Sequence, residues 1–272
     1  MRLGFLASER QYADHLRPLW DFSGPFLRTW HRSLRSEADV WIVAATRDLR
    51  QVPDAVYMDH GCGLQWHAAR NIALLKSARG VLAPNEFLAE RYRRVGIDAA
   101  VVGTPKMDAL VGAPYHPGGP VAVSFHWTGS QRAQKLYQGA LLDLPYPLLG
   151  HGHPRAKLAK YWANMGVEYV EDFRQVVERA SVYACDHSST IYEWAALGRP
   201  VVLLDVPQQQ HIRPMSSGLR YRIHADVGCT ATPATLRDVL AAPRPPTDVS
   251  ELFPFLGSSV ARVRTVLGER YG

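Results

Sequence analysis

The stretch ACDHSSTIYEWAALGRPVVLLDVP, residues 184–207, has the pattern of a strand end, a polar turn, a short helix and a second strand. Small and β-prone residues up to Cys185 predict the strand end, and apolar residues at helical spacing predict a helix over 190–197. Gly198 and Pro200 should end that helix, because glycine favours the left-handed C-terminal conformation and proline cannot continue a helix. The apolar run that follows is typical of a parallel strand covered on both faces. The stretch therefore predicts an α/β protein with a parallel sheet.

The turn at 186–189 is a candidate phosphate site. In an open parallel sheet, ligands collect at the carboxyl ends of the strands, where this turn would lie. The first turn of a helix leaves N–H groups unpaired, and the hydroxyls of Ser188 and Ser189 add further polar groups. Glu193 lies about one and a half turns into the helix, placed to accept hydrogen bonds from a ribose. The structural alternative is that Asp186 or Ser188 only caps the helix.

The sequence DHSSTIYEWAALGRPVVLLD at 186–205 resembles the signature of the CDP-glycerol glycerophosphotransferase family. Members of that family extend teichoic-acid-type polymers and have a glycosyltransferase B fold. Their pattern is Asp-x-Ser-Ser, an acidic residue a turn later, and Gly-Lys-Pro before an apolar strand. Here Arg199 replaces the lysine, a mild change. A weaker likeness exists to UDP-N-acetylglucosamine 2-epimerase and other nucleotide-sugar enzymes of the same fold, which usually have Ser-Gly-Gly where this chain has Ser188 and Ser189.

The resemblance implies two Rossmann-like, doubly wound domains that face a cleft. We expect an acceptor-side domain over 1–112 and a nucleotide-donor domain over 118–252, with a C-terminal helix over 258–271 that packs back on the first domain. Alternating strand and helix patterns in both halves agree with a doubly wound α/β fold. The segment GAPYHPGGP at 112–120 is rich in glycine and proline and is the best linker candidate.

His60 is the candidate catalytic base. It follows a predicted strand over 55–59 and is the first residue of a His-Gly-Cys-Gly loop. Imidazole suits base catalysis near neutral pH, although a structural or idle histidine is the commoner reading of such a pair. The resemblance implies that His60 activates the acceptor hydroxyl, because these transferases have His-Gly at the matching place. Gly61 would allow the loop to approach the acceptor.

Three further residues are candidates for acceptor or loop contacts. The sequence GTPKMD at 103–108 resembles the family's Gly-x-Pro-Arg-x-Asp motif. Lys106 replaces the arginine, keeping the charge but losing the bidentate phosphate geometry. Asp108 is the motif's acidic residue, with a helix cap as its plain alternative. Arg213 lies near the place of a flexible loop that closes over donor or acceptor in the family, although surface arginines with no such duty are commoner.

The donor side has candidates of its own. The resemblance implies that His153, in a His-Pro pair, binds or protonates the donor phosphate, since a cation there stabilises charge on the departing nucleotide. Thr128 and Arg155 are candidate phosphate contacts, although Thr128 would equally cap a helix. Tyr169 is a candidate for the base pocket. His151 and His153 would also resemble a metal site, but with no carboxylate nearby in sequence we expect no metal; structural histidines are the other alternative.

The composition is that of an ordinary globular protein, with 272 residues, 47% hydrophobic and 21% charged. No apolar run approaches the roughly 20 residues of a membrane span, and the N-terminus lacks signal-peptide features. The three cysteines fit neither a metal spacing nor a disulfide framework, so we expect a cytoplasmic protein, with peripheral membrane attachment left open. The net charge of +6 suits phosphates, nucleotides, an anionic polymer or membrane head groups, and equally an ordinary basic surface.

These observations together predict a transferase that needs no cofactor. It would move a glycerophosphate-like group from a CDP-activated donor to a hydroxyl acceptor, for which an anionic polymer is one candidate. One alternative is a nucleotide-sugar glycosyltransferase or 2-epimerase-like enzyme on the same fold. Another is a non-catalytic protein that binds the nucleotide without turnover.

Overall fold

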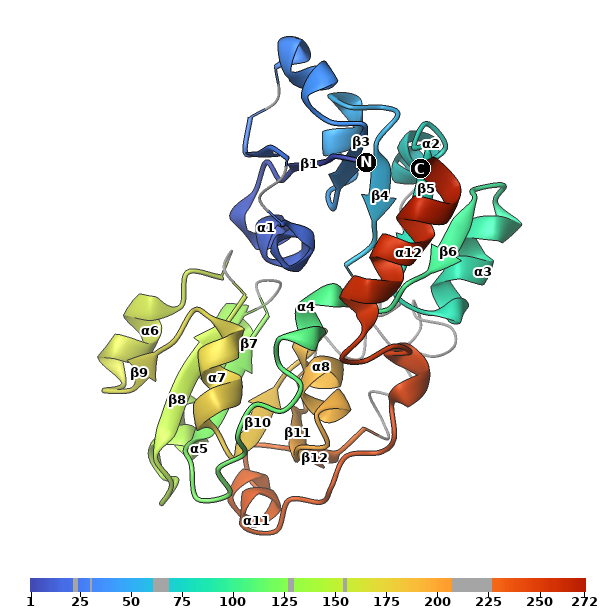
Figure 1. Ribbon diagram of the computed structural model, residues 1–272. Coiled ribbons are helices and arrows are strands. Elements are labelled where there is room, and N and C mark those ends of the chain that lie inside the picture. The colour runs from blue at the N-terminus through green and yellow to red at the C-terminus, as the bar shows by residue number, and fades with distance from the viewer. Residues whose placement is uncertain (22–23, 30, 61–68, 127–129, 154–155, 207–226) are drawn as a thin grey trace. The chain divides into compact units, whose positions relative to one another are not determined.

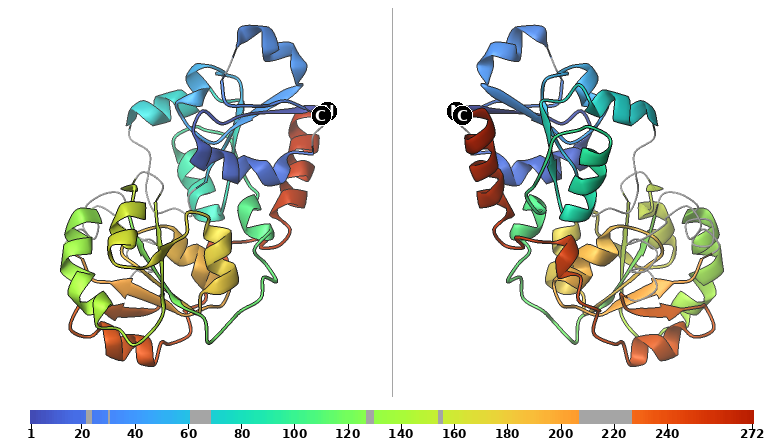
Figure 2. Two further views of the ribbon diagram at one scale, coloured as in Figure 1. Left: turned by 90° about the vertical axis from the view of Figure 1, so that its left-hand side faces the viewer. Right: turned by 90° about the vertical axis from the view of Figure 1, so that its right-hand side faces the viewer.

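The computed structural model describes residues 1–21, 24–29, 31–60, 69–126, 130–153, 156–206 and 227–272. The chain divides into two compact units (Figure 1). Unit 1 comprises Met1–Val111 and Ser250–Gly272, and unit 2 comprises Gly112–Val249. The glycine- and proline-rich segment at 112–120 therefore begins unit 2. The two chain termini lie close together in unit 1 (Figure 2).

Unit 1 is built on one six-stranded parallel sheet in the order β2-β1-β3-β4-β5-β6. Its strands are β1 (Leu3–Leu6), β2 (Phe26–Leu27), β3 (Val40–Val43), β4 (Val56–Met58), β5 (Gly80–Ala83) and β6 (Ala99–Val101). Its helices are α1 (Arg10–Leu16), α2 (Ala69–Leu75), α3 (Glu86–Arg94), α4 (Pro105–Asp108) and α12 (Ser259–Tyr271), with 3-10 helices η1 (Arg17–Leu19), η2 (Arg32–Glu37), η3 (Asp48–Arg50) and η5 (Ser250–Leu252). Strands β1, β3, β4 and β5 are buried at every residue, as the continuous apolar runs predict for a parallel sheet with both faces covered.

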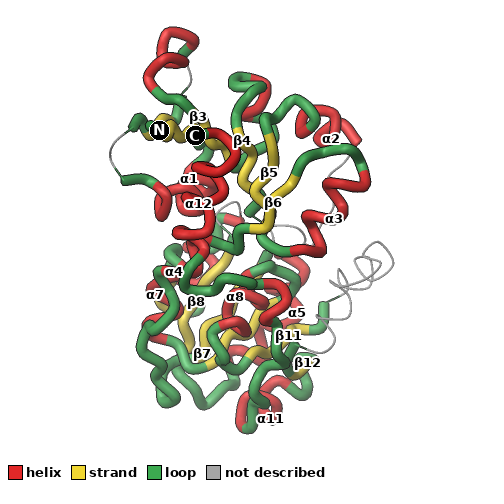
Figure 3. Tube along the Cα trace, turned by 45° about the vertical axis from the view of Figure 1, so that its right-hand side comes forward, coloured by secondary structure: helices red, strands yellow, loops and turns green. Residues whose placement is uncertain are grey.

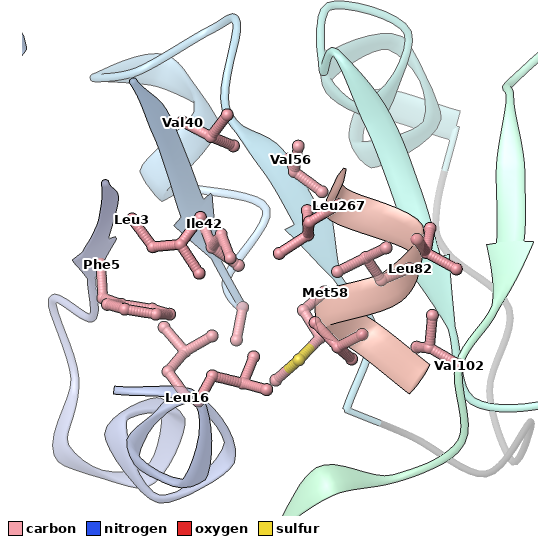
Figure 4. Close-up of a cluster of buried hydrophobic side chains, with 14 of the residues drawn as sticks. Leu3, Phe5, Leu16, Val40, Ile42, Val56, Met58, Leu82, Val102 and Leu267 are labelled. Atoms are coloured by element: carbon pink, nitrogen blue, oxygen red, sulfur yellow. The ribbon is translucent and has the colours of Figure 1, made fainter. Parts of the chain in front are cut away.

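Side chains alternate along these strands and so form two cores, one on each face of the sheet. On one face, Phe5 and Ile42 pack with Leu267 of α12 (Figure 4). On the other face, Val43 packs in a cluster with Tyr92 of α3. Figure 3 shows α3 beside β5 and β6. The sheet is thus held rigidly between helices, which fixes the positions of the residues at its carboxyl edge.

The C-terminal helix α12 is anchored by Asp108. One carboxylate oxygen of Asp108 accepts a hydrogen bond from the backbone N–H of Gly257 at 3.0 Å, and the other accepts from Val260 N–H at 2.8 Å. A carboxylate at the first turn of a helix satisfies orphan N–H groups and complements the helix dipole. Val263, Val266 and Leu267 then bury one face of the helix against the strands of unit 1.

Unit 2 has a second six-stranded parallel sheet, in the order β12-β11-β10-β7-β8-β9. Its strands are β7 (Val121–Phe125), β8 (Leu148–Gly152), β9 (Glu168–Tyr169), β10 (Val182–Cys185), β11 (Val201–Leu204) and β12 (Cys229–Ala231). Its helices are α5 (Ser130–Leu142), α6 (Ala159–Asn164), α7 (Phe173–Arg179), α8 (Thr190–Ala196) and α11 (Leu236–Ala241). The chain runs outward from β7 to β9, then crosses back to β10 and continues to the other edge. The topological switch point therefore lies between β7 and β10, where ligands bind in doubly wound sheets.

The sequence-based prediction of an α/β fold with two parallel sheets is confirmed, with one strand longer than expected and several short elements not predicted. The sequence predicts a strand over 146–149 followed by a turn, whereas β8 continues to Gly152 and includes His151. Strands β2 and β12 and helices α4, α6 and α11 were not predicted, because runs of two to six residues show the period of a strand or a helix only weakly. No helix of the described ranges is long and apolar enough to cross a bilayer.

Arg199 holds the start of unit 2 in place. Its side chain is buried, and its guanidinium donates to the carbonyl oxygens of Val177, Ala113 (2.7 Å) and Pro114 (3.1 Å). The guanidinium also lies over the ring of Trp194, 5.3 Å from its centroid. A planar fork with several donors suits this set of carbonyls, and a single ammonium does not.

Arg199→Lys is therefore expected to lower the free energy of unfolding by about 2 kcal/mol, because at least one buried carbonyl loses its donor. Urea unfolding would measure the change. The matched control is Arg174→Lys, since Arg174 is exposed and pairs with Glu178 on the same helix. That variant should shift stability by less than about 0.5 kcal/mol. Equal midpoints for the wild type and Arg199→Lys would contradict this prediction.

Candidate functional site

The switch point of unit 2 is organised by the buried carboxylate of Asp186. Its Oδ1 accepts hydrogen bonds from the backbone N–H groups of His126 at 2.9 Å and His187 at 2.6 Å. His126 follows β7 and Asp186 follows β10, so one carboxylate ties the ends of two neighbouring strands together. Burial raises the pKa of Asp186 to about 7, although the two N–H donors act in the opposite direction. Asp186 thus joins two loops and is not a helix cap.

Three imidazoles lie side by side just beyond the strand ends. The ring of His126 is 4.4 Å from that of His187 and 5.4 Å from that of His153, measured between centroids. Nδ1 of His187 is 3.5 Å from a carboxylate oxygen of Asp186. His187 is buried, whereas His126 and His153 are partly exposed. The predicted residue His153 therefore has His126 as a neighbour, and His126 in turn contacts His187; the sequence singled out neither of these two.

Ser188 is the first member of a buried hydrogen-bonded chain. Its Oγ accepts from the hydroxyl of Thr190 at 2.9 Å, and Thr190 Oγ1 lies 2.8 Å from the hydroxyl of Tyr183. Tyr183 in turn lies 3.0 Å from Nδ1 of His151, which is also 3.1 Å from Ser124 Oγ. His151 is therefore part of the buried interior, in agreement with its structural alternative. This series of hydrogen bonds fixes the orientation of the Ser188 hydroxyl from within the protein.

The other predicted donor-side residues are placed differently. Ser189 is the N-cap residue of α8, is partly exposed, and makes no side-chain capping bond. Glu193 is 3% exposed, so contact with a ribose requires its side chain to turn outward. Tyr169 lies on β9 and packs partly buried against the core of unit 2; burial, then the charge of Glu171, raises the pKa of its hydroxyl. Thr128 and Arg155 lie outside the described residues.

At the carboxyl edge of the sheet in unit 1, His60 follows β4 and stands among aromatic and basic side chains. Its ring lies 4.9 Å from that of Tyr12 and 5.1 Å from that of His15, both on α1. Burial, then the positive charge of Lys106, then His60 lower the pKa of His15 well below its usual value. His15 is therefore a neutral neighbour of His60 at physiological pH. Of the predicted acceptor residues, Lys106 belongs to this cluster.

The strand end beneath His60 is fixed by Asp59. Its backbone N–H donates to Leu82 O at 3.0 Å, and its carboxylate accepts a hydrogen bond from the hydroxyl of Tyr92. Burial, followed by the charge of Asp59, raises the pKa of Tyr92, so this hydroxyl keeps its proton. The backbone next to His60 is thus held from both the neighbouring strand and α3.

The carboxylate of Asp108 binds helix α12 and not the cluster around His60. Both of its oxygens bind backbone N–H groups at the start of α12, which is the helix-capping alternative from the sequence. Gly61 and Arg213 lie outside the described residues. The structure therefore groups His60 with Lys106 in unit 1, and His153 with the loop that carries Ser188 in unit 2.

Sequence reasoning missed His15, His126 and His187. The available signal was positional, because His126 is the first residue after a buried strand and His187 is the second. Within the described part of the chain, no group of three His, Cys, Asp or Glu side chains is arranged to hold a metal ion.

Comparison with known proteins identifies solved structures with a similar fold. No protein-family model and no curated protein matches the sequence. Among solved structures, the wall teichoic acid polymerase TagF, as a variant soaked with CDPG, is similar with a TM-score of 0.62 and 12% identity, covering 99% of this chain and 83% of that chain. A putative UDP-N-acetylglucosamine 2-epimerase from Listeria monocytogenes is similar with a TM-score of 0.58 and 12% identity, covering 97% of this chain and 94% of that chain. A further UDP-N-acetylglucosamine 2-epimerase has a TM-score of 0.55 at 12% identity, covering 99% and 95%.

The protein has the glycosyltransferase B fold. Two parallel sheets with flanking helices agree with these neighbours over nearly the whole chain. At 12% identity the likeness shows the fold.

Proposed function

We propose that this protein is a metal-independent transferase that moves a glycerophosphate group from CDP-glycerol to a hydroxyl acceptor. The observation that carries the proposal is the pair of polar clusters at the carboxyl edges of the two sheets. One contains His60 and Lys106, both near His15. The other contains His153 beside His126, whose ring contacts that of His187 next to Ser188. The fold shared with TagF, and the resemblance of 186–205 to the glycerophosphotransferase signature, support the choice of donor.

In the proposed reaction, the acceptor oxygen attacks the phosphorus atom that bears the glycerol. Its proton passes to the imidazole of His60. The bond from that phosphorus to the bridging oxygen of the diphosphate breaks, and CMP leaves with the electron pair. His153, Ser188 and Ser189 hold the diphosphate and offset the negative charge that grows on CMP, in a site whose groups are already oriented.

The remaining candidates take supporting parts in this proposal. Thr128 and Arg155 would add phosphate contacts, and Tyr169 and Glu193 would contact the nucleoside. Lys106 would favour an acceptor that carries negative charge, such as an anionic polymer, in agreement with the net charge of +6. An acceptor of this kind at a membrane surface would bring the protein there peripherally.

A nucleotide-sugar donor is the second candidate. The similarity to the Listeria epimerase covers 94% of that protein, more than the 83% coverage of TagF, and so favours a UDP-sugar as much as the other likeness favours CDP-glycerol. The two candidates differ in their leaving groups, because a sugar transfer releases UDP and a glycerophosphate transfer releases CMP. A protein that binds donor without turnover is the third candidate.

Calorimetric titration with CDP-glycerol, UDP-N-acetylglucosamine and a GDP-sugar, in EDTA, tests the proposal. We expect CDP-glycerol to bind at least about tenfold tighter than the sugars, a difference of about 1.4 kcal/mol. Ser189→Ala should weaken that binding by about tenfold, because a charge-assisted hydrogen bond to phosphate is lost. Ser77→Ala is the matched control, since Ser77 is exposed in unit 1 and should leave affinity unchanged.

Nucleotide release with hydroxyl acceptors then separates the candidates. Release of CMP that depends on the acceptor would support the transferase proposal. Preference for a UDP-sugar with UDP release would replace it with the second candidate. Tight donor binding with no release across an acceptor panel would favour a binding protein.

A further inference from the structure

His126 is the central ring of the three-histidine cluster in unit 2, and neither the sequence motifs nor the proposed reaction uses it. The register of strands β10, β7 and β8 places His126 between His187 and His153. Cys185 pairs with Ser124, and Phe125 pairs with Gly152, so the residues just beyond these pairs continue the same rows. One row past the strands, His187, His126 and His153 stand next to one another.

The backbone holds this row without help from the imidazoles themselves. Asp186 binds the N–H groups of His126 and His187, and the N–H of His153 donates to Phe125 O at 3.3 Å. A side-chain change at His126 therefore leaves these hydrogen bonds in place. Sites held by backbone hydrogen bonds keep their geometry when a ligand arrives.

The three rings have different access to solvent. His187 is buried, with Nδ1 3.5 Å from Asp186, so it contacts His126 and serves as a positioning residue behind it. His126 and His153 are partly exposed and can reach a ligand. Two partly exposed imidazoles next to each other offer N–H donors for oxygen atoms that lie a few ångströms apart, as those of a diphosphate do.

We propose that His126 and His153 together form a proton-coupled site for the phosphate oxygens of a diphosphate, with His187 as a positioning residue. Two neighbouring imidazolium rings repel each other, so the empty site resists full protonation; a bound anion removes that penalty and draws a proton from solvent. The site rests on the proposed function for its natural ligand, the diphosphate of a nucleotide donor. Its chemistry is tested without a nucleotide.

The titratable groups around the cluster favour tighter binding of an anion at lower pH. Asp186 faces the cluster from β10, with Cys185 beside it, and Tyr137 of α5 and Asp205 after β11 lie behind. Burial raises the pKa of Asp186 to about 7, so this carboxylate loses its negative charge as the pH falls below 7. Burial also raises the pKa of Cys185 above its usual value, so its thiol stays neutral over the same range. Lowering the pH below 7 therefore adds positive charge on the imidazoles and removes negative charge from Asp186. Both changes strengthen binding of an anion.

Calorimetric titration of the full chain with inorganic pyrophosphate in EDTA tests this inference. The affinity should fall at least about tenfold between pH 6 and pH 8. Titrations at pH 7 in two buffers of different ionisation enthalpy should show uptake of about half a proton or more per pyrophosphate bound. This second measurement uses the wild type and so does not depend on whether a variant folds.

The variant His126→Gln should weaken pyrophosphate binding at pH 6 by about tenfold and reduce proton uptake, while the melting temperature stays close to that of the wild type. His116→Gln is the matched control, because His116 is an exposed histidine of the same unit. The same change of affinity between pH 6 and pH 8 in His126→Gln as in the wild type, or wild-type proton uptake in that variant, would overturn the inference. Pyrophosphate binding that appears only with added Zn²⁺ would also overturn it, in favour of a metal site.

The two proposals can fail separately. CMP release from CDP-glycerol together with pyrophosphate binding that takes up no proton would overturn this inference alone. Proton-coupled pyrophosphate binding without any donor turnover would overturn the proposed transferase alone.

Discussion

His60→Gln is expected to lower the acceptor-dependent release of nucleotide by about 10²–10⁴-fold, the usual contribution of a general base. The glutamine side chain cannot take a proton from the acceptor hydroxyl near neutral pH. It keeps a polar group of similar length against Tyr12 and His15, so the local packing should survive. Donor affinity should stay within about twofold of the wild type, because the proposed diphosphate contacts lie in unit 2. Initial rates and calorimetric titration with CDP-glycerol measure the two quantities.

His31→Gln provides the matched control for this experiment. His31 is an exposed histidine of the same unit, whose Nδ1 lies 2.8 Å from Ser33 Oγ on the surface, and its loss should change neither rate nor affinity. A His60→Gln protein that retained more than about a tenth of the wild-type rate would assign the base to another residue. A large loss of donor affinity in the same variant would instead mean that His60 contacts the donor.

Asp186→Asn is expected to reduce the dependence of stability on pH. Burial raises the pKa of this carboxyl from 3.8 to about 7, so the folded protein keeps a proton that the unfolded chain releases. Between about pH 4 and pH 7 the folded state therefore binds more protons than the unfolded state, and stability falls as the pH rises. The full effect of this shift is about 4 kcal/mol. Asparagine has no charge to bury, and its amide oxygen still accepts a backbone N–H.

Urea unfolding at pH 5, 6.5 and 8 would measure this difference. The stability of Asp186→Asn relative to the wild type should rise with pH and level off above the pKa of Asp186. Asp143→Asn serves as the control, because Asp143 is exposed and its replacement should change the free energy of unfolding by less than about 0.5 kcal/mol. If the stability of Asp186→Asn minus that of the wild type stayed constant or fell with rising pH, the pKa of this carboxyl would not be raised in the folded protein.

Both predictions concern a polar residue that follows a parallel strand, one in each unit. In unit 1, His60 just after β4 is partly exposed and is the proposed base. In unit 2, the residue after β10 is buried and organises its neighbours. The polar residue that follows a parallel strand can thus serve the chemistry directly or hold the loop that does, and its burial distinguishes the two.

Residue pattern alone located most of the elements that carry the candidate site. Asn85 illustrates why: its side chain accepts from Leu88 N–H at the start of α3, and Gly96 just beyond the helix has a φ of 77°. Such caps are local, so three or four neighbouring residues suffice to recognise them. The strand-turn-helix-strand unit at 184–204 was predictable for the same reason.

Roles that depend on long-range contacts were not predictable in this way. The sequence leaves Asp108 open between acceptor contact and helix cap, and its two oxygens bind N–H groups about 150 residues further along the chain. The sequence predicts that the strand before His151 ends at 149, yet β8 continues through His151, which is buried. In both cases the decisive partner is distant in sequence, and no local pattern reports it.

The sequence by itself determined the α/β class, the order of the main strands and the polar character of the turns after them, because backbone preference and the spacing of apolar residues act over a few neighbours. Only the tertiary structure decided that His126, His153 and His187 form one row and that Asp186 joins two of their loops. Their strands are far apart in the chain, and the hydrogen-bond register between β10, β7 and β8 alone sets which residues stand side by side.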